Sequence, residues 1–572
     1  MKLRIFTAML AAIALLCCAC GGGSKSTPPP AMYTIGGTVS GLSGTGLVLQ
    51  DNASDNLAIS GNENFTFSTS ITSGGTYKVT VSTQPSGQTC TVANSSGTAS
   101  ANVTNVQVTC AALPTYTIGG TVSGLTGAGL ILQDNGGDNL SITANGSFTF
   151  ATAIVSGESY NATVSTPPIT PLQVCLVSNG SGTANANVTN VAVTCSTPTE
   201  QVLYAFGSAP DGNTPTGSFV FDSSGNLYGI TETGGAFGDG TVFELSPGAG
   251  GQWTEKVLYS FCPQSGCVDG SGPNGGLVFD TAGNLYGTTT YGGASGSGAA
   301  FELTPKSGGT WTETVLHSFG NGTDGFVPVA GLVFDSAGNL YGTTSRGGTG
   351  GLNCPTSGLN SCGIAFELSP GSESQWTETV LYNFCSQAEC ADGYNPQASL
   401  IIDAAGNLYG TATFGGSNAL EGTVFELSPG KDGQWVHSTI FDFPQSGGNP
   451  VAGLVQDKAG NLYGTAANLA GFGGVFSLTP GAGGTWTYKA LYAFCRPGAG
   501  CLDGNYPHAG VVFDKAGNLY GTNGTVFELM PGENGTWAEL ILYDGGGTGG
   551  VVLDGAGNLY VAAGDSVVEV TP

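Results

Sequence analysis

Aspartates recur along the chain in a pattern that could place a ring of carboxylates on one surface. The pattern Asp-Gly-x-x-Pro occurs at Asp211, Asp269, Asp324, Asp392 and Asp503. Carboxylate oxygens are the ligands that Ca²⁺ takes in proteins, and they accept hydrogen bonds from other polar ligands. The competing interpretation is structural, because Asp, Gly and Pro all favour turns. The sequence leaves a Ca²⁺ site and a set of turn residues as alternatives, and it indicates no other cofactor.

Signatures of catalysis are missing from the sequence. It contains no His-Glu-x-x-His and no phosphate-binding Gly-Lys-Ser/Thr. His508 follows the last Asp-Gly-x-x-Pro motif and is the histidine best placed for chemistry, so it joins the candidate face. Asp269, Asp324 and Asp392 are candidates for the paired carboxylates of a glycoside hydrolase or lyase. Two carboxylates across a central pocket would favour that enzyme, and a channel lined only by small residues would count against it.

Residues 199–572 consist of seven copies of one repeat. Its signature is a hydrophobic run followed by Asp-x-x-Gly-Asn-Leu-Tyr. The seven copies of the signature begin at Asp222, Asp280, Asp335, Asp403, Asp457, Asp514 and Asp554. Each copy holds four short runs typical of strands, as in Gly276–Asp280, Leu285–Thr289, Ala300–Thr304 and Trp311–Phe319. Four antiparallel strands per repeat are typical of a propeller blade, so the region is predicted to be a seven-bladed β-propeller.

The ends of this region predict that it closes into a ring. The seventh copy stops after its third strand, and the strand that it lacks stands alone at the start of the region. This N-terminal strand is expected to complete the last blade, because closure removes exposed sheet edges. We expect it to bury Val202, Leu203, Tyr204 and Phe206. The linkers between blades and the loops after each second strand are expected to share one loop-rich face.

Other recurring residues are expected to be structural. A tryptophan opens the fourth strand of six copies and is expected to pack between blades on the outer side. A glutamate recurs in the third strand, where we expect a hydrogen-bonded carboxylate between blades. His317 and His437 fall in outer strands and are assigned no chemistry. The tryptophans are Trp253, Trp311, Trp376, Trp435, Trp486 and Trp537, and the glutamates are Glu244, Glu302, Glu367, Glu426, Glu528 and Glu569.

A second repeat precedes the first. The run Tyr-Thr-Ile-Gly-Gly-Thr-Val-Ser-Gly-Leu begins at Tyr33 and again at Tyr116. Short alternating runs follow in both copies, with Gly and Asn between them, which is typical of strands and turns. We therefore predict two small β-sandwich modules, Ig-like or prealbumin-like, over residues 33–112 and 113–198. They are expected to act as spacer or adhesive modules.

Cysteine usage indicates an oxidising compartment. Three of the 15 cysteines lie near the N-terminus, and the other twelve form six local pairs. Even numbers and close spacing in an exported chain predict disulfides. Zinc is the rival interpretation, and it lacks a Cys-x-x-Cys knuckle. The predicted pairs are Cys90 with Cys110, Cys175 with Cys195, Cys262 with Cys267, Cys354 with Cys362, Cys385 with Cys390, and Cys495 with Cys501.

The N-terminus has the features of a targeting segment. A basic start and a short apolar run precede Cys17, Cys18 and Cys20. This stretch resembles a bacterial lipobox, and we predict a lipoprotein signal over residues 1–20 with lipidation at Cys20. Cys18 is the alternative, and an ordinary cleaved signal peptide is a third. Residues 21–32 are expected to be a flexible tether. The predicted location is the outer membrane or cell surface, with secretion as the alternative.

The charge balance limits the partners. Twelve Lys and Arg stand against 39 Asp and Glu, for a formal net charge of −27. No basic stripe is available for a phosphate backbone, so nucleic acid is excluded as a direct partner. A surface this acidic favours cations or neutral polymers such as glycans.

The repeat of residues 200–572 resembles a known family. Units such as Gly-Leu-Val-Phe-Asp-x-Ala-Gly-Asn-Leu-Tyr-Gly-Thr-Thr, Phe-Glu-Leu-Ser-Pro and Trp-Thr-Glu-Thr-Val-Leu-Tyr-Ser-Phe are similar to the Gloeobacter/Verrucomicrobia (GloVer) tandem repeat. The Asp-x-x-Gly-Asn-Leu-Tyr hairpin also resembles that of NHL-type propellers. The resemblance implies an exported bacterial protein with a surface anchor. It supplies no catalytic residues.

Two functions follow as hypotheses. The first is a non-catalytic binding or adhesion scaffold at the cell surface, which presents the loop-rich face to a glycan or another extracellular ligand. The second is an extracellular carbohydrate-active enzyme that uses carboxylates of that face. The sequence does not define the oligomeric state.

Overall fold

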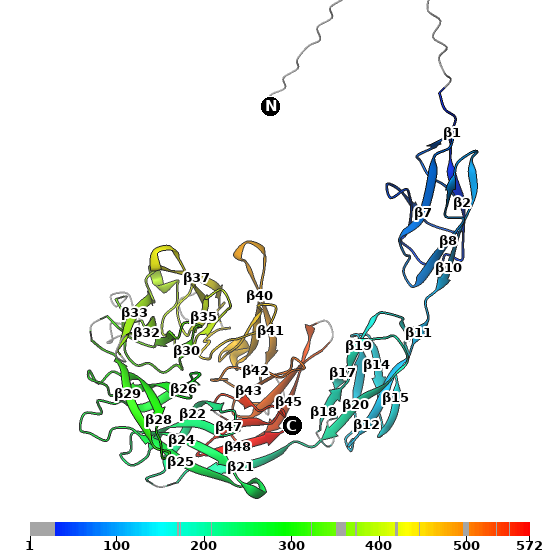
Figure 1. Ribbon diagram of the computed structural model, residues 1–572. Helices are drawn as coiled ribbons and strands as arrows, with labels where there is room; N and C mark the ends of the chain where they lie inside the picture. Colours follow the sequence, from blue (N-terminus) through cyan, green and yellow to red (C-terminus); the bar gives the residue numbers. More distant parts are fainter. Residues whose placement is uncertain are drawn as a thin grey trace, which may run out of the picture. The chain divides into compact units, whose positions relative to one another are not determined.

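The computed structural model describes residues 29–572 (Figure 1), except 169–170, 172, 208, 322, 350–361, 372–374, 418–420, 446, 496–500, 502, 533–534 and 548. The described chain consists of β-strands and a few three-residue 3-10 helices, which confirms the predicted all-β class. None of the described helices is long and apolar enough to cross a membrane.

The first module has two four-stranded sheets around one core. One sheet has the order β5-β2-β10-β8 and the other β4-β3-β7-β9. Ile35, Leu49, Val79 and Val106 come from both sheets and are buried together. The strands are β1 Met32–Tyr33, β2 Ile35–Ser40, β3 Leu47–Asp51, β4 Asp55–Ile59, β5 Asn64–Thr66, β6 Ile71–Thr72, β7 Thr76–Thr83, β8 Gln88–Ala93, β9 Ser96–Thr98 and β10 Val103–Ala112.

The second module repeats this arrangement, with sheets β15-β12-β20-β18 and β14-β13-β17-β19. The shared Ile-Gly-Gly-Thr-Val motif has a steric cause. It forms the strand that pairs in parallel with the last long strand of its module, and a Cβ on Gly37 or Gly120 would overlap the backbone of that strand. The strands are β11 Thr115–Tyr116, β12 Ile118–Ser123, β13 Ile131–Asp134, β14 Asp138–Ser141, β15 Gly146–Thr149, β16 Ile154–Val155, β17 Ser159–Thr166, β18 Val174–Ser178, β19 Ser181–Thr183 and β20 Val188–Ser196.

The repeats of residues 199–572 form four-stranded antiparallel meanders. A parallel contact between Ser218 and Gly276 joins the meanders of repeats 1 and 2 into one eight-stranded sheet, and every other repeat has its own sheet. Repeat 7 supplies three strands and takes β21 as its fourth.

The strands of this region, repeat by repeat, are as follows. Repeat 1 has β22 Gly212–Phe221, β23 Leu227–Gly234, β24 Thr241–Pro247 and β25 Trp253–Ser260; repeat 2 has β26 Ser271–Phe279, β27 Leu285–Tyr291, β28 Ala299–Pro305 and β29 Trp311–Ser318. Repeat 3 has β30 Val333–Phe334, β31 Leu340–Thr344, β32 Ile364–Pro370 and β33 Trp376–Asn383; repeat 4 has β34 Ile401–Ile402, β35 Leu408–Ala412, β36 Thr423–Pro429 and β37 Trp435–Asp442. Repeat 5 has β38 Val455–Gln456, β39 Leu462–Ala466, β40 Gly474–Pro480 and β41 Trp486–Ala493; repeat 6 has β42 Val512–Phe513, β43 Leu519–Thr522, β44 Val526–Pro531 and β45 Trp537–Tyr543. Repeat 7 has β46 Val552–Leu553, β47 Leu559–Ala563 and β48 Ser566–Thr571, with β21 Thr199–Ala205 beside β48.

The Asp-x-x-Gly-Asn motif forms the turn between the first and second strands, as the structural interpretation predicts. In repeat 1, Oδ1 of Asp222 accepts the backbone N–H groups of Ser224 (2.8 Å) and Asn226 (2.9 Å). Its Oδ2 accepts the Asn226 side-chain amide and the Tyr228 hydroxyl. The other six repeats have the same set of bonds. One carboxylate thus closes each hairpin and holds the tyrosine of the second strand.

Consecutive repeats pack through pairs of phenylalanines. The phenylalanine that follows a fourth strand lies against the third-strand phenylalanine of the next repeat, at a centroid distance near 5 Å. The pairs are Phe206–Phe243, Phe261–Phe301, Phe319–Phe366, Phe384–Phe425, Phe443–Phe476 and Phe494–Phe527. At the junction between repeats 6 and 7, Leu542, Val551 and Val568 take part in a shared aliphatic cluster instead.

The N-terminal strand joins the last repeat to the first. β21 pairs antiparallel with β48, from Thr199 opposite Thr571 to Ala205 opposite Ser566. Phe206 then packs on Phe243 of repeat 1, as the other junction phenylalanines do. The pairing of the isolated strand with the end of the chain is as predicted.

The burial of this strand differs from the prediction at one residue. Leu203 and Phe206 are buried and Tyr204 is half-buried, whereas Val202 is 55% exposed. The register of β21 shifts between Val202 and Tyr204, so Leu203 is an extra residue on this strand. A bulge of this kind changes the side on which the preceding side chains lie.

The recurring tryptophans pack between repeats, as predicted. Trp311 contacts Tyr228 of the preceding repeat at 6.4 Å, and Trp253 contacts Tyr560 at 6.1 Å. The third-strand glutamates differ from the prediction, because their partners lie within the same repeat. The Tyr286 hydroxyl of the neighbouring strand donates to Glu302 at 3.0 Å.

We predict that Phe206→Ala lowers the free energy of unfolding by about 3–5 kcal/mol, because it removes a buried ring from the junction that joins the ends of the ring of repeats. Val202→Ala, on the exposed side of the same strand, is the matched control and should cost less than about 0.5 kcal/mol. Thermal and urea unfolding measure both. Equal stability of the two variants would show that β21 does not close the structure.

Candidate binding face

Among the described residues, the long connections lie at one end of the repeats. The linkers between repeats bond to the loops between the second and third strands, so both kinds of segment lie on the same side. Tyr506 N–H donates to the Phe472 carbonyl (2.7 Å), and Val327 N–H donates to the Ser297 carbonyl (2.9 Å). We call this side the loop-rich face; it comprises the loops 234–240, 292–298, 413–417 and 467–473 with the linkers 209–212, 262–272, 323–328, 385–396 and 503–508.

The five predicted aspartates lie beneath this face rather than on it. Asp269, Asp324 and Asp392 are buried, and Asp211 and Asp503 are half-buried. Asp392 shows the arrangement most clearly, because it is fully inaccessible. It accepts the Tyr382 hydroxyl (2.7 Å) and the backbone N–H groups of Ser386 (2.8 Å) and Gln387 (3.2 Å). The carboxylate holds the linker against the fourth strand of the preceding repeat.

The other four aspartates hold their linkers in the same way, and we call this arrangement a brace. Each accepts a side chain of the preceding fourth strand and a backbone N–H at the start of its own linker. The side-chain donors are Tyr204 to Asp211 (3.1 Å), Tyr259 to Asp269 (2.9 Å) and Tyr492 to Asp503 (3.4 Å). The backbone donors to the same three aspartates are Gly207 (2.8 Å), Cys262 (3.0 Å) and Cys495 (2.9 Å).

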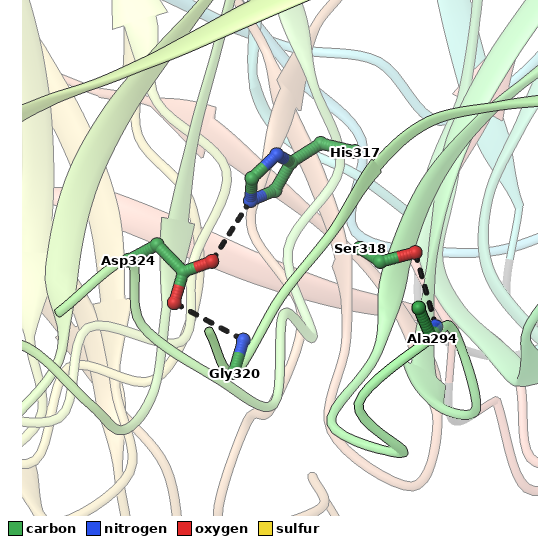
Figure 2. Close-up of polar contacts among 5 residues, drawn as sticks. All are labelled: Ala294, His317, Ser318, Gly320 and Asp324. Atoms are coloured by element: carbon green, nitrogen blue, oxygen red, sulfur yellow. Dashed lines mark hydrogen bonds and ion pairs between the residues drawn. The ribbon is translucent and has the colours of Figure 1, made fainter. Parts of the chain in front are cut away.

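Figure 2 shows the version in which histidine replaces tyrosine. His317 Nε2 lies 3.1 Å from Oδ2 of Asp324, and Gly320 N–H donates to Oδ1 at 3.2 Å. Burial lowers the pKa of His317, although Asp324 acts to raise it. His317 thus occupies the position that tyrosine has at the other four aspartates.

These braces bear on the Ca²⁺ interpretation. A calcium site needs six to eight oxygen ligands around one point. In the described part of the chain, two groups of three residues could hold a metal, Cys362–Cys385–Cys390 and Asp239–Cys262–Cys267. Cys262, Cys267, Cys385 and Cys390 are half-cystines, and a disulfide sulfur is not the thiolate ligand that metals require. None of the five braced aspartates belongs to either group, and Ca²⁺ binding by them stays a prediction.

The disulfides clip the linkers of this face. Cys262–Cys267, Cys385–Cys390 and Cys495–Cys501 close short loops beside the braces, and Cys90–Cys110 and Cys175–Cys195 lie in the two modules. Five of the six predicted pairs are thus confirmed. The sixth involves Cys354, which lies outside the described residues, as do Cys18 and Cys20. Such disulfide density is typical of proteins outside the cytoplasm.

Exposed aromatic side chains gather on the loop-rich face, and sequence reasoning missed them. Phe237, Phe472 and Tyr506 lie in segments of this face and are 52, 39 and 45% exposed, and Tyr291, the last residue of β27 beside the loop 292–298, is 57% exposed. Phe472 and Tyr506 face one another across the junction of repeats 5 and 6, at a centroid distance of 6.3 Å. His508 lies two residues further along the linker and is exposed. The sequence offered a signal for these residues. All four aromatics fall in predicted loops, and apolar side chains grouped on an exposed surface mark interaction sites.

The first strands of neighbouring repeats approach too closely to leave a side-chain-lined pocket between them. A Cβ on Gly275 would lie 2.4 Å from the backbone nitrogen of Gly331, and one on Gly217 would lie 2.4 Å from the Gly275 carbonyl. Gly550 N–H donates to the Gly217 carbonyl at 3.1 Å, which brings repeat 7 against repeat 1. Asp269, Asp324 and Asp392 belong to separate junctions. The described residues therefore do not bring these three aspartates together, and the enzyme hypothesis stays a hypothesis.

The opposite face has a groove of about 450 Å³ between repeats 7 and 1. It is lined by Asp222, Trp253, Asp554 and Tyr560 among others. Its two aspartates hold the Asp-x-x-Gly-Asn turns. Burial acts to raise the pKa of Asp222, but the hydrogen bonds from Asn226 and Ser224 outweigh it and hold the pKa below its ordinary value. Both carboxylates are thus engaged in the turns that they close.

The meandering four-stranded sheets, joined end to start by β21, define an all-β repeat protein of propeller-like construction. The Gloeobacter/Verrucomicrobia repeat model matches residues 173–355 and 353–525, which is more than half of the chain, and the protein belongs to that family. This confirms the resemblance drawn from the repeat units.

Solved structures are similar only in outline. They include a streptogramin B lyase (13% identity, TM-score 0.42, covering 65% of this chain and 97% of that one) and the extracellular domain of a hybrid two-component system from B. thetaiotaomicron (15%, 0.41, 68% and 43%). A gluconolactonase from Xanthomonas campestris matches at 15% identity and a TM-score of 0.30, covering 48% of this chain and 82% of that one. Likenesses this distant carry no argument about activity. No curated protein sequence matches the chain.

The brace at Asp392 gives a stability prediction. Asp392→Ala leaves a hydroxyl and two N–H groups without their acceptor in a buried place, and we expect a loss of about 2–4 kcal/mol in unfolding free energy. Asp544→Ala removes an exposed aspartate of another linker and should change stability by less than about 0.5 kcal/mol. Urea unfolding compares the two, and a similar small loss in both would mean that the buried aspartate is not a brace.

Proposed function

We propose that this protein is an exported, lipid-anchored bacterial binding protein: a seven-bladed β-propeller, carried on two β-sandwich modules, whose loop-rich face binds a neutral glycan. The lipid anchor at Cys20 rests on the sequence pattern, and the disulfides agree with export. The observation that carries the proposal is the set of four exposed aromatic rings on one face of a rigid scaffold.

The scaffold favours binding without large rearrangement. Each linker of the loop-rich face is fixed by its aspartate or its disulfide or both, so side chains on these segments are held in place. Function commonly resides in loops that a rigid framework positions. Tyrosine and phenylalanine give large contact areas at a low cost in side-chain entropy. The face is thus preorganised for recognition through flat, apolar surfaces.

The charge of the protein selects the ligand class. With a formal net charge of −27, the protein repels anionic polymers, so acidic polysaccharides and acidic lipid surfaces are disfavoured. The loop 467–473 and the linker 503–508, which carry Phe472 and Tyr506, contain no Lys or Arg. Aromatic rings stack on the apolar face of a sugar ring without needing a charge. A neutral polysaccharide combines both requirements.

Affinity electrophoresis tests the proposal with the mature chain in gels that contain neutral β-glucan, xylan or galactomannan, or anionic alginate. We expect retention by at least one neutral polymer and none by alginate. The double variant Phe472→Ala/Tyr506→Ala should lose at least about tenfold in affinity, since each lost ring contact is worth on the order of 1 kcal/mol. Val436→Ala, an exposed apolar side chain in β37, should bind as the parent does.

Two outcomes contradict the proposal. One is the absence of retention by every neutral polymer. The other is unchanged retention of the double variant, which would place the binding site away from Phe472 and Tyr506. Equal melting temperatures of variant and parent show that any loss comes from the face and not from the fold.

A further inference from the structure

The exposed apolar side chains of the loop-rich face gather at two junctions between repeats. The other exposed large apolar side chains in the described part of residues 199–572 lie in fourth strands. Each of the two junctions therefore presents a separate apolar patch. Patch A comprises Phe237, Val268 and Tyr291, where repeat 1 meets repeat 2, and patch B comprises Phe472 and Tyr506, where repeat 5 meets repeat 6.

The backbone at these two junctions is arranged in the same way. The Gly272 N–H donates to the Asp239 carbonyl at 2.9 Å, as the Tyr506 N–H donates to the Phe472 carbonyl at 2.7 Å. Gly272 and Tyr506 both have a positive φ, of 61° and 45°, and each precedes the proline of its linker. Gly272 and Tyr506 therefore hold equivalent places in their linkers.

Different parts of the sequence bring an aromatic ring to this place. In patch B the residue itself, Tyr506, supplies the ring. Gly272 has no side chain, but a Cβ added to it would lie 3.5 Å from Cδ2 and 3.9 Å from Cε2 of Tyr291. The ring of Tyr291, at the end of β27, thus lies beside the place where the side chain of Tyr506 begins at the other junction. The two patches share the position of a ring, although one ring comes from a linker and the other from a strand.

The backbone of Tyr506 makes its ring costly to place there. Residues other than Gly, Asn and Asp seldom adopt a positive φ. At the three junctions between the patches the same place is taken by Val327, Asn395 and Asn449, with φ of 61°, 60° and 57°. Val327 is half-buried and so gains from packing, whereas Tyr506 is 45% exposed. A strained residue whose ring adds little to the core points to a contact outside the protein.

The two patches lie on opposite sides of the loop-rich face. The series of repeats is closed, because β21 pairs with β48 and the Gly550 N–H donates to the Gly217 carbonyl at 3.1 Å. Counted around the seven copies, patch A and patch B are four junctions apart in one direction and three in the other. A ligand that touches both patches must therefore cross the face.

We propose that patches A and B bind one and the same polysaccharide chain, which lies across the loop-rich face, so that the protein selects long neutral polymers over short sugars. This inference rests on the glycan binding proposed above and specifies the ligand of that face. A disaccharide offers one sugar ring to each of the two aromatic rings of patch B and leaves patch A empty. A chain that reaches both patches makes its second contact intramolecularly, and its affinity rises accordingly.

The linkers that carry the patches hold them at a fixed separation. Cys262–Cys267 closes the linker of patch A, and Cys495–Cys501 closes that of patch B. Asp269 and Asp503 fix the same two linkers through their backbone N–H groups. Two contacts that are already in place before binding cost less ordering when a chain bridges them.

Isothermal titration calorimetry with the mature chain tests the proposal. The probes are whichever of β-glucan, xylan and galactomannan is retained in the gel, and the disaccharide of its backbone. We expect the polymer, counted per disaccharide unit, to bind at least about tenfold more tightly than the disaccharide. Phe237→Ala/Tyr291→Ala should lose at least about tenfold in polymer affinity, because it leaves only patch B. Its affinity for the disaccharide at patch B should equal the parent's.

The matched control is Val202→Ala/Val436→Ala, which removes two exposed apolar side chains of the fourth strands β21 and β37. It should bind polymer and disaccharide as the parent does. Equal melting temperatures show that the variants are folded. The comparison of polymer with disaccharide needs the parent alone, so it decides even where a variant fails to fold.

Two results overturn the inference and leave glycan binding intact. One is a preference for the polymer of less than about tenfold per disaccharide unit. The other is a folded Phe237→Ala/Tyr291→Ala variant with the parent's affinity for the polymer, which would make patch B a complete site. If the parent binds none of the neutral polymers, the proposed function itself is wrong, and this inference falls with it.

Discussion

Packing between consecutive repeats is the constraint on which the rest of this structure depends. A single repeat exposes apolar residues on both faces of its sheet and cannot bury them alone. At six junctions the phenylalanine after a fourth strand solves the problem by packing on the third-strand phenylalanine of the next repeat, as Phe261 does on Phe301. The ends of the series need the same contact, and Phe206 supplies it on Phe243. The N-terminal strand is thus fixed by the same packing rule as the internal ones.

That packing also determines where polar groups must go. The chain turns into a linker directly after the packed phenylalanine, so the first backbone N–H groups of the linker lie next to the core. A buried aspartate accepts them together with the hydroxyl of the tyrosine two residues before the phenylalanine, as at Tyr259, Phe261 and Asp269. The aspartates that the sequence offered as ligands are therefore bonded to their own linkers, and these linkers become a firm support for the exposed rings.

Most of the fold, but little of the candidate binding face, could be predicted from the sequence. The sequence shows the period of the repeat, the four strands of each copy and the solitary strand at Gln201–Phe206, because strand patterns depend on the local alternation of apolar and polar residues. The exposure of Val202 was not predictable, since it comes from a bulge that only the pairing with β48 reveals. The burial of Asp392 was missed because its hydroxyl partner, Tyr382, lies ten residues earlier and meets it only after the linker folds back. The available signal was a recurring order: a tyrosine, a phenylalanine two residues later, and an aspartate 7 to 11 residues after the tyrosine.

The proposed binding face places its charged and its apolar groups at different depths. The aspartate carboxylates lie beneath the face, where Asp392 accepts the Tyr382 hydroxyl and two backbone N–H groups of its linker. The aromatic rings of Phe472 and Tyr506 are exposed above them. In a protein with a formal net charge of −27, self-repulsion weakens the compact state, and each carboxylate that is bonded to its own linker opposes this effect locally. The proposed contacts with a neutral sugar involve no charge, so the same acidic groups can stabilise the linkers without taking part in binding.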